Sequence, residues 1–432
     1  MRKHLLMLIL LFVAVAVRAN NNEIEEMLKK IDAVTGFEQL EKVDTTRTYY
    51  LLKFRQLLDP KNADAGTFEQ RVMLGHRGYD RPTVLVTEGY GGDYAFKNKK
   101  YMEELTRILD ANIVFVEYRY FLESRPQPCN WDYLTVENSM YDYHAIVSAL
   151  KPFYNKKWAA TGVSKGGSTT IFYRAYFPND VDVSVPYVAP LSCALEDGRH
   201  ESFLEQASTK ADRDAIRNFQ FLLLQNKDKF MPMFDKYCLE KGYTFHVPTS
   251  TVYDLCVLEY QFSFWQWGSS VEKIPVGTAE ESEIFNYFIR SCEPSYFARQ
   301  NGLDSFSVQA VKDFGYYGYN VEPFKEYIDV EDIEGYYKRV MLPAEWADTV
   351  FDDYNYRFVT DFLTDNDPKM IFIYGEWDPW TASGVTWLRD RNKENIHIYV
   401  EPGGSHKARI GTMSKEVQIE ILNKLNEWMQ YK

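Results

Sequence analysis

The stretch Ala159–Ala175 constrains this chain most, because it holds a serine between two glycines in Gly162-Val163-Ser164-Lys165-Gly166. Residues Lys157–Thr161 predict a short buried strand before it. The residues after it predict a helix that ends before Pro178, since proline breaks helices. A sharp strand-to-helix turn exposes the serine hydroxyl, and glycines fit where the two backbones approach closely. A G-x-S-x-G pattern also arises by chance, so other parts of the chain must support this serine as a nucleophile.

The first residues predict a signal peptide. Arg2 and Lys3 precede an apolar run from Leu5 to Val17, and Val17-Arg18-Ala19 offers a cleavage point. The run is too short to span a bilayer. We therefore expect residues 1–19 to be removed and the mature chain to be exported, to the periplasm or the medium, without stable membrane insertion. An uncleaved anchor is the alternative.

Composition excludes some functions. The formal net charge is −13, and removal of the basic signal residues makes it more negative, so the surface should repel nucleic acids.

An oxidising compartment leads us to expect at least one disulfide, although the pairing is open. Scattered histidines and the absence of C-x-x-C spacing predict no metal and no cofactor. The five cysteines are Cys129, Cys193, Cys238, Cys256 and Cys292.

Alternating strand and helix patterns predict a mostly parallel, doubly wound α/β sheet. A hairpin of Tyr49–Leu58 and Thr67–Arg77 comes first, after a short helix at Glu23–Val34. Helices are expected at Lys97–Asp110, Thr135–Phe153 and Ser414–Tyr431. The core strands are expected at Pro82–Thr87, Ile113–Glu117, Lys157–Thr161, Val181–Ala189, Lys369–Tyr374 and Asn395–Val400.

Between about Leu195 and Pro343 the pattern becomes helical and rich in aromatic residues. We interpret residues 195–343 as a helical cap inserted into the sheet domain, which then comprises residues 20–194 and 344–432. Ligands of such sheets bind at the carboxyl ends of the strands, so a cap there would cover the site.

Three residues, each directly after a predicted strand, form a candidate catalytic triad: Ser164, Asp378 and His406. Their order along the chain is that of the α/β-hydrolase fold. Serine needs an imidazole base, and the imidazole needs a carboxylate to fix its tautomer. Asp378 alone would be a turn aspartate before a proline, and His406 alone a surface histidine. Together, at matching strand ends, they favour catalysis.

A serine hydrolase also needs backbone N–H groups that stabilise the oxyanion. Lys165 follows the nucleophile and supplies one. Gly89 or Tyr90, after the strand at Pro82–Thr87, is the candidate for the second. The Lys165 side chain as the base for Ser164 is an alternative, but a side chain at this position usually points away.

Several motifs resemble those of prolyl carboxypeptidase and its dipeptidyl-peptidase relatives: Glu117-Tyr118-Arg119-Tyr120-Phe121, Gly375-Glu376-Trp377-Asp378-Pro379-Trp380 and Gly403-Gly404-Ser405-His406. Tyr118 stands where those enzymes usually have histidine, and Val163-Ser164-Lys165 replaces their Gly-Ser-Tyr. The sharp turn around the serine, Gly162–Gly166 (G-V-S-K-G), is called the elbow. This elbow and the loop G-G-S-H-K-A-R are more similar to secreted tripeptidyl aminopeptidases. This resemblance implies hydrolysis of short, proline-tolerant peptides from a free N-terminus.

A free N-terminus calls for a buried carboxylate and a cap that blocks longer substrates. Glu88 and Glu259 are the candidates, although Glu88 would otherwise pair with Arg119, and Glu259 would otherwise be an exposed helix residue. Trp265 and Trp380, together with Trp267, are candidates for a proline pocket, although aromatic residues at this spacing are more often core.

The first interpretation is thus an exported serine exopeptidase. A carboxylesterase or lipase would use the same triad and differ in its cap. A non-catalytic binding protein on this scaffold is the third possibility, and the intact triad argues against it.

Overall fold

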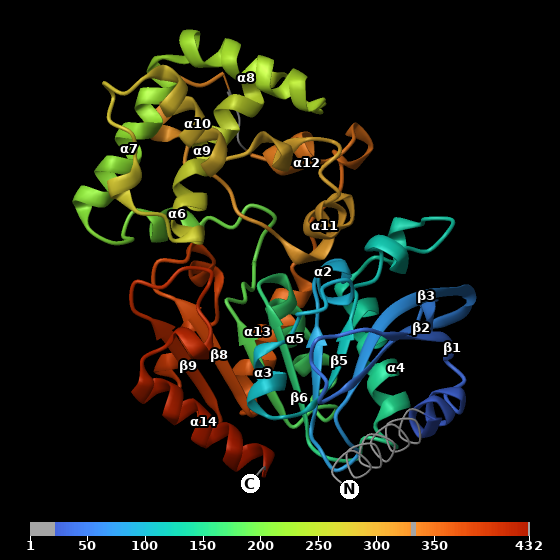
Figure 1. The fold of residues 1–432 in the computed structure, drawn as a ribbon. Coiled ribbons are helices and arrows are strands. Elements are labelled where there is room, and N and C mark those ends of the chain that lie inside the picture. Colours follow the sequence, from blue (N-terminus) through green and yellow to red (C-terminus); the bar gives the residue numbers. More distant parts are fainter. Residues whose placement is uncertain (1–21, 330–333, 431–432) are drawn as a thin grey trace, which may run out of the picture.

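The structure is a computed structural model that describes residues 22–329 and 334–430, so the expected signal peptide lies outside the described residues. It consists of one large sheet with helices on both faces and a further group of helices at one end (Figure 1). The sheet has nine strands in the order β1-β2-β3-β5-β4-β6-β7-β8-β9.

The first four strands in this order pair antiparallel, and from β5 to β9 every pair is parallel. The core strands β4, β5, β6, β7 and β8 are almost wholly buried, as expected for parallel strands covered on both faces. The bounds are β1 Val34–Leu40, β2 Thr48–Asp59, β3 Asn62–His76, β4 Thr83–Thr87, β5 Asn112–Val116, β6 Trp158–Val163, β7 Val183–Tyr187, β8 Met370–Gly375 and β9 Ile396–Glu401.

Helices cover both faces of the sheet, and on each face they pack against the strands to form an apolar core. One layer comprises α4 (Val136–Leu150), α5 (Lys165–Tyr176) and α13 (Tyr354–Asp365), together with a helix at residues 22–29. The other comprises α2 (Asp93–Phe96), α3 (Glu104–Ile108) and α14 (Lys415–Met429). This arrangement is the α/β-hydrolase fold expected from the sequence.

Between β7 and β8, helices α6 to α12 gather in a separate group beside the carboxyl ends of the strands, whereas α13 returns to the sheet (Figure 1). They lie within the stretch expected to be a cap, and the boundaries at residues 195 and 343 stay predictions. The bounds are α6 Arg199–Leu204, α7 Lys210–Gln225, α8 Lys227–Lys241, α9 Thr249–Trp267, α10 Glu281–Ser291, α11 Asp304–Gln309 and α12 Tyr336–Met341, with a π-helical turn at Ala310–Phe314.

The structure differs from the expected elements near the N-terminus. The helix expected at Glu23–Val34 ends at residue 29, and Val34 already begins the edge strand β1. The helix expected at Lys97–Asp110 is reduced to α3, because the Glu103 carboxylate accepts hydrogen bonds from the N–H groups of Leu105 and Thr106 and caps the helix there.

The expected disulfide is absent, since all five cysteines are free thiols. Cys129 is exposed on a loop and Cys193 is half-buried. Cys238, Cys256 and Cys292 are buried among the helices of the cap stretch, where they pack as small apolar side chains. Burial raises the pKa of each of these three thiols and therefore keeps them in the unreactive neutral form.

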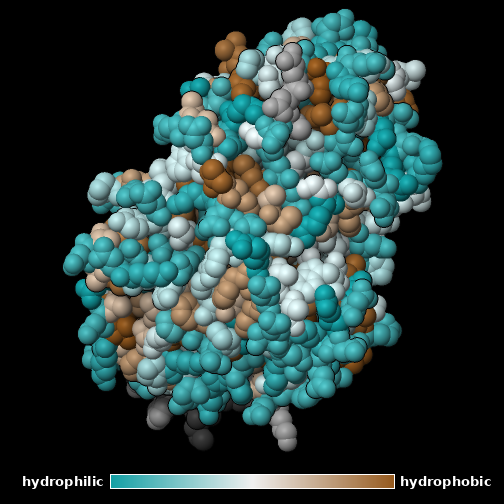
Figure 2. Space-filling view, turned by 180° about the vertical axis from the view of Figure 1, so that it is seen from behind, coloured by the Kyte–Doolittle hydropathy of each residue, from teal (hydrophilic) through white to brown (hydrophobic). Residues whose placement is uncertain are grey.

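One face of the surface is shown in Figure 2. It is mostly hydrophilic, and its hydrophobic residues lie in small separate groups. Among the described residues, no helix combines the length and the apolar composition needed to cross a bilayer.

A buried ion pair fixes the loop after β5. Arg119 donates two hydrogen bonds of 2.7 Å to the Asp142 carboxylate on α4 and three more to the carbonyl oxygens of Leu57, Leu58 and Tyr133. Both charged side chains are almost fully buried. Each supplies the charge that the other needs in a dry site.

Removal of the arginine should therefore be costly. We expect Arg119→Met to lower the free energy of unfolding by about 3–5 kcal/mol, because Asp142 would keep a buried, unpaired charge. Urea unfolding measures this. The control is Lys210→Met, which removes an exposed pair with Asp214 and should change stability by less than about 1 kcal/mol. Equal effects of the two substitutions would contradict a structural role of the buried pair.

Candidate active site

Ser164 lies in a strained turn between β6 and α5. Its backbone has φ 57° and ψ −123°, a conformation that L-residues rarely adopt and that costs about 1–3 kcal/mol. The turn is held by a hydrogen bond from the Ser164 N–H to the Tyr187 carbonyl oxygen on the neighbouring strand. The glycines are required by close backbone contact, because a Cβ on Gly162 would lie 2.2 Å from the Gly166 carbonyl oxygen.

Asp378 and His406 meet after two further strands. Nδ1 of His406 donates to Oδ2 of Asp378 over 2.7 Å, and Oδ1 of Asp378 accepts the N–H of Trp380. Asp378 is fully buried and His406 is 6% exposed. The carboxylate thus fixes the imidazole with its proton on Nδ1 and leaves Nε2 as the acceptor.

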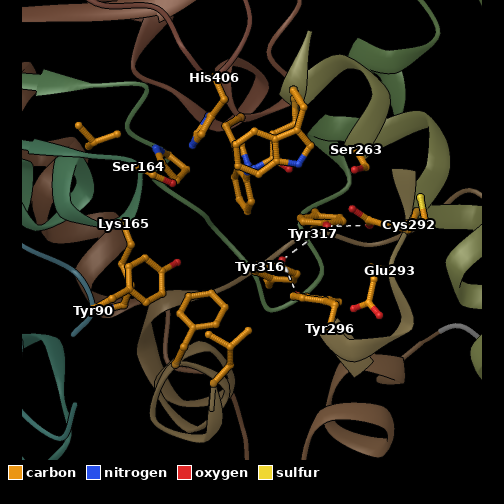
Figure 3. Close-up of a pocket in the computed structure, with 18 of the residues that line it drawn as sticks. Tyr90, Ser164, Lys165, Ser263, Cys292, Glu293, Tyr296, Tyr316, Tyr317 and His406 are labelled. Atoms are coloured by element: carbon orange, nitrogen blue, oxygen red, sulfur yellow. Dashed lines mark hydrogen bonds between the residues drawn. The ribbon is translucent and has the colours of Figure 1, made fainter. Parts of the chain in front are cut away.

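Nε2 of His406 is buried and has no hydrogen-bond partner among the described residues. Figure 3 shows the imidazole above Ser164, with both side chains facing the same cavity. A base that is unbonded without substrate is compatible with catalysis, since such hydrogen bonds often tighten only when substrate binds.

The loop after β4 lies directly against the elbow. A Cβ on Gly89 would be 2.8 Å from the Gly166 nitrogen, so the two backbones are in contact. The Lys165 N–H lies at the start of α5, where helical N–H groups have no partner within the helix. The Tyr90 N–H donates a long, 3.2 Å hydrogen bond to the Glu88 carboxylate. An oxyanion would have to share or replace that bond.

A cavity of about 680 Å³ extends from Ser164 into the cap stretch. Its end at the sheet is formed by Ser164, Lys165 and His406. Aromatic rings follow, and polar side chains from α9 and α10 and the segment after α10 form the far wall (Figure 3). The aromatic residues that line the cavity are Tyr90, Trp267, Tyr296, Phe297, Phe306, Phe314, Tyr316, Tyr317 and Trp380.

Glu259 on α9 lines this cavity. Its carboxylate accepts hydrogen bonds from the hydroxyls of Tyr317 (2.7 Å) and Tyr319 (2.8 Å). Burial raises the pKa of Glu259 to about 7, although these two hydrogen bonds act in the opposite direction. No cation among the described residues pairs with this carboxylate. It is therefore a half-buried acceptor able to receive a positive group of a ligand.

The other candidate carboxylate faces elsewhere. Glu88 does not line the cavity, and its side chain accepts hydrogen bonds from the Tyr94 hydroxyl and the Tyr90 N–H. It also does not pair with Arg119, whose partner is Asp142. Strand β4 ends so that the Glu88 side chain turns toward α2, which carries Tyr94.

Of the candidate tryptophans, Trp380 lines the cavity and is 7% exposed. Trp267 also reaches it. Trp265 does not, because it packs against Trp377 in the core.

Tyr317 and Tyr319 were not expected from the sequence to be partners of Glu259. They lie about 60 residues away in the chain, and no periodic pattern connects them to α9. Among the described residues, no cluster of three or more His, Cys, Asp or Glu side chains is placed to hold a metal ion.

A strained serine at the carboxyl end of a parallel strand, beside a carboxylate-bound histidine, is the arrangement found in hydrolases of this fold. Residues 19–431 match the model of the family PS-10 peptidase S37, and the chain belongs to this family. It is therefore a serine exopeptidase that acts on peptides, as the resemblance of its motifs implied.

The chain is similar to several individual proteins. The chain is 29% identical over 438 residues to the prolyl tri/tetrapeptidyl aminopeptidase of Streptomyces mobaraensis, covering 96% of this chain and 87% of that protein. It is 27% identical over 161 residues to the lysosomal Pro-X carboxypeptidase of Homo sapiens, covering 34% and 32%. Among solved structures, proline iminopeptidase of Mycobacterium smegmatis is similar at 12% identity and a TM-score of 0.43, covering 91% and 99%.

The close backbone contact at the elbow should make activity sensitive to a methyl group added at Gly162. We expect Gly162→Ala to lower peptidase activity by about 100-fold, because a backbone shift of the order of 1 Å at the nucleophile costs that much. The matched control is Gly198→Ala, where the added Cβ meets nothing within 4 Å and φ is −69°. Initial rates of peptide hydrolysis and thermal unfolding are measured for both variants. An active Gly162→Ala enzyme would contradict the tight elbow.

Proposed function

We propose that this protein cleaves short peptides from their free N-terminus, releasing tripeptides through an acyl-enzyme on Ser164. The observation that carries the proposal is the single cavity that has Ser164 and His406 at one end and the Glu259 carboxylate in its wall. The Streptomyces mobaraensis relative, named a prolyl tri/tetrapeptidyl aminopeptidase, supports this assignment.

In the proposed mechanism, Oγ of Ser164 attacks the scissile carbonyl carbon while Nε2 of His406 takes the hydroxyl proton. The tetrahedral intermediate collapses, and His406 gives the proton to the leaving amine. Water then attacks the acyl-enzyme with His406 again as base and releases the peptide acid. Asp378 holds the imidazole and stabilises its charged form through the 2.7 Å hydrogen bond.

The oxyanion that forms in each step needs N–H donors. In this proposal the Lys165 N–H is one donor, and Gly89 or Tyr90 supplies the other. Side chains and water suffice for the reaction, so the proposed mechanism uses no cofactor.

The ammonium group of the substrate would pair with Glu259. A half-buried carboxylate with two neutral hydroxyl partners lacks a positive charge, and an N-terminal ammonium supplies one. The helices that line the cavity would stop a longer chain from extending past Glu259. The number of residues between Glu259 and Ser164 thus sets the length of the product.

The aromatic rings between these two groups suit a proline side chain. Trp380, Tyr316 and Phe306 line this part of the cavity and lie close to one another, with ring centroids of the contacting pairs 5.5 Å apart. A rigid pyrrolidine ring packs on such surfaces at little cost in conformational entropy.

We further propose that residues 1–19 direct export and that nucleic acids are not partners. The support is the basic and apolar pattern of residues 1–19 and the net charge of −13.

Product analysis tests the direction and the nucleophile together. Incubation with peptides that have free N-termini should release tripeptides, detected by mass spectrometry, whereas N-acetylated copies should remain intact. Ser164→Ala should lower the rate by about 10⁴-fold or more. Cleavage of acetylated peptides or trimming from the C-terminus would contradict the aminopeptidase proposal. Full activity of Ser164→Ala would contradict the triad. Hydrolysis of simple esters without hydrolysis of peptides would favour an esterase.

The recognition site predicts a pH dependence. Because the pKa of Glu259 is raised to about 7, its carboxylate is present above pH 7 and is lost as the pH falls. Free α-amino groups lose their proton near pH 8. We therefore expect the KM for free peptides to be lowest at about pH 7–8 and to rise on the acid side. Steady-state kinetics from pH 5 to 9 measure this profile.

Substitution of Glu259 tests the contribution of its carboxylate to substrate binding. Glu259→Gln should raise the KM by about 10–100-fold and remove the acid-side rise, since a charged partner contributes about 1.5–3 kcal/mol. The matched comparison is Glu293→Gln, which also lines the cavity but accepts hydrogen bonds from Tyr237, Tyr243 and the Ser295 N–H. A larger effect at Glu293 would contradict the assignment of the ammonium site to Glu259.

A further inference from the structure

The side chain of Lys165 has no part in the mechanism above, yet it is buried in the active site. Lys165 directly follows the nucleophile and is 1% exposed. Its Nζ donates a 2.8 Å hydrogen bond to the carbonyl oxygen of Gly89. Figure 3 shows the side chain running from the elbow toward Tyr90 and away from His406. The amine therefore faces the loop after β4 and is not positioned as the base for Ser164.

Aromatic rings surround this amine. Nζ lies 3.5 Å from the centre of the Tyr118 ring, 5.2 Å from Phe314, 5.5 Å from Phe121 and 5.6 Å from Tyr90. The negative faces of such rings favour a cation. Tyr118 and Lys165 are also two of the positions at which the chain departs from the carboxypeptidase pattern, the third being Val163. Tyr118 and Lys165 are in direct contact, so the ring and the amine form one unit.

The bond to Gly89 acts on the loop that carries the second candidate oxyanion donor. A peptide group is planar, so the direction of its carbonyl fixes the direction of its N–H. Lys165 holds the carbonyl of the peptide group whose N–H belongs to Tyr90. The preceding peptide group is held in the same way, because the Tyr143 hydroxyl donates a 2.6 Å hydrogen bond to the Glu88 carbonyl oxygen.

We propose that the Lys165 side chain is a positioning residue of the oxyanion hole: its ammonium group holds the Gly89–Tyr90 peptide in the orientation that the transition state requires. The inference rests on the proposed function, because it presumes that this loop supplies an oxyanion donor. One residue then organises both sides of the hole, through its backbone N–H at the start of α5 and its side chain on the facing loop.

The charge state of the amine matters to this role. Burial lowers the pKa of Lys165 to about 7, and the nearby charges of Glu88 and Asp313 oppose this shift. The phenols of Tyr118 and Tyr90 also face the amine, and their pKa values are raised by burial, so they stay neutral. A charged donor makes a hydrogen bond about twice as strong as a neutral one. The hold on Gly89 should therefore weaken as the pH rises past 7.

The experiment compares wild-type enzyme with Lys165→Met, which keeps the length of the side chain and removes the donor. The substrate is a tripeptidyl para-nitroanilide, and the probe of the tetrahedral state is the corresponding tripeptide boronic acid, which forms a bond from its boron to Oγ of Ser164. The released tripeptide serves as a ground-state ligand. The control is Lys151→Met, which removes hydrogen bonds to the carbonyl oxygens of Asn179 and Asp180 near the C-terminal end of α4.

We expect Lys165→Met to lower kcat by about 10–100-fold. This decrease is no larger than the decrease in kcat caused by removal of an oxyanion donor itself. Affinity for the boronic acid should fall by a similar factor. The KM and the affinity for the tripeptide should change by less than about 3-fold, a separation that a merely structural defect would not produce. Lys151→Met should keep the wild-type kcat. Unchanged kcat and boronic-acid affinity in Lys165→Met would overturn the inference.

Failure of the proposed function can be distinguished from failure of the role inferred for Lys165. In the first case, wild-type enzyme would neither cleave the anilide nor bind the boronic acid. If Lys165→Met does not fold, the pH dependence of the wild-type kcat decides. The inference predicts a fall in kcat on the alkaline side, as Lys165 loses its proton. A kcat that stays constant from pH 7 to 9 would overturn the inference.

Discussion

The positive φ of Ser164 is the constraint on which the rest of the site depends. A backbone conformation that costs about 1–3 kcal/mol persists only where its surroundings hold it. Here the hydrogen bond to Tyr187 and the close approach of Gly162 and Gly166 supply that support. The parallel strands on either side supply the rest, because their carboxyl ends bring the loops after β4, β5, β8 and β9 to the same edge.

Helix α9 connects Glu259 with His406. It carries Glu259 in its second half, and at its end the carbonyl oxygen of Gln266 accepts the N–H of His406. Lys407 strengthens the same junction by donating to the carbonyl oxygen of Trp267. Glu259 and His406 are thus held by one helix, and in the proposed function a peptide bound at Glu259 would be presented at a fixed distance from Ser164.

The sequence predicted the parts of the site that follow strands. Ser164 and Asp378 follow the buried strands β6 and β8, and His406 follows the half-buried strand β9; the pattern of such strands is local and regular. The side chains that surround them depend on contacts between distant segments. The partners of Glu259 and the placement of Lys165 on the Tyr118 ring have no periodic signal. The turn of Glu88 toward Tyr94, six residues further along the chain, is a local contact without such a signal either. Strand β1 was missed for a related reason, since tertiary packing overrides weak local preferences.

In the proposed function, a peptide lies with its N-terminus at Glu259 and its third peptide bond at Ser164. A crystal structure of Ser164→Ala with a tetrapeptide bound tests this most directly. We expect the N-terminal ammonium to lie within hydrogen-bond distance of the Glu259 carboxylate and the third carbonyl carbon to lie beside residue 164. A peptide bound in the reverse direction, with its C-terminal carboxylate in the cap and its N-terminus toward solvent, would contradict it.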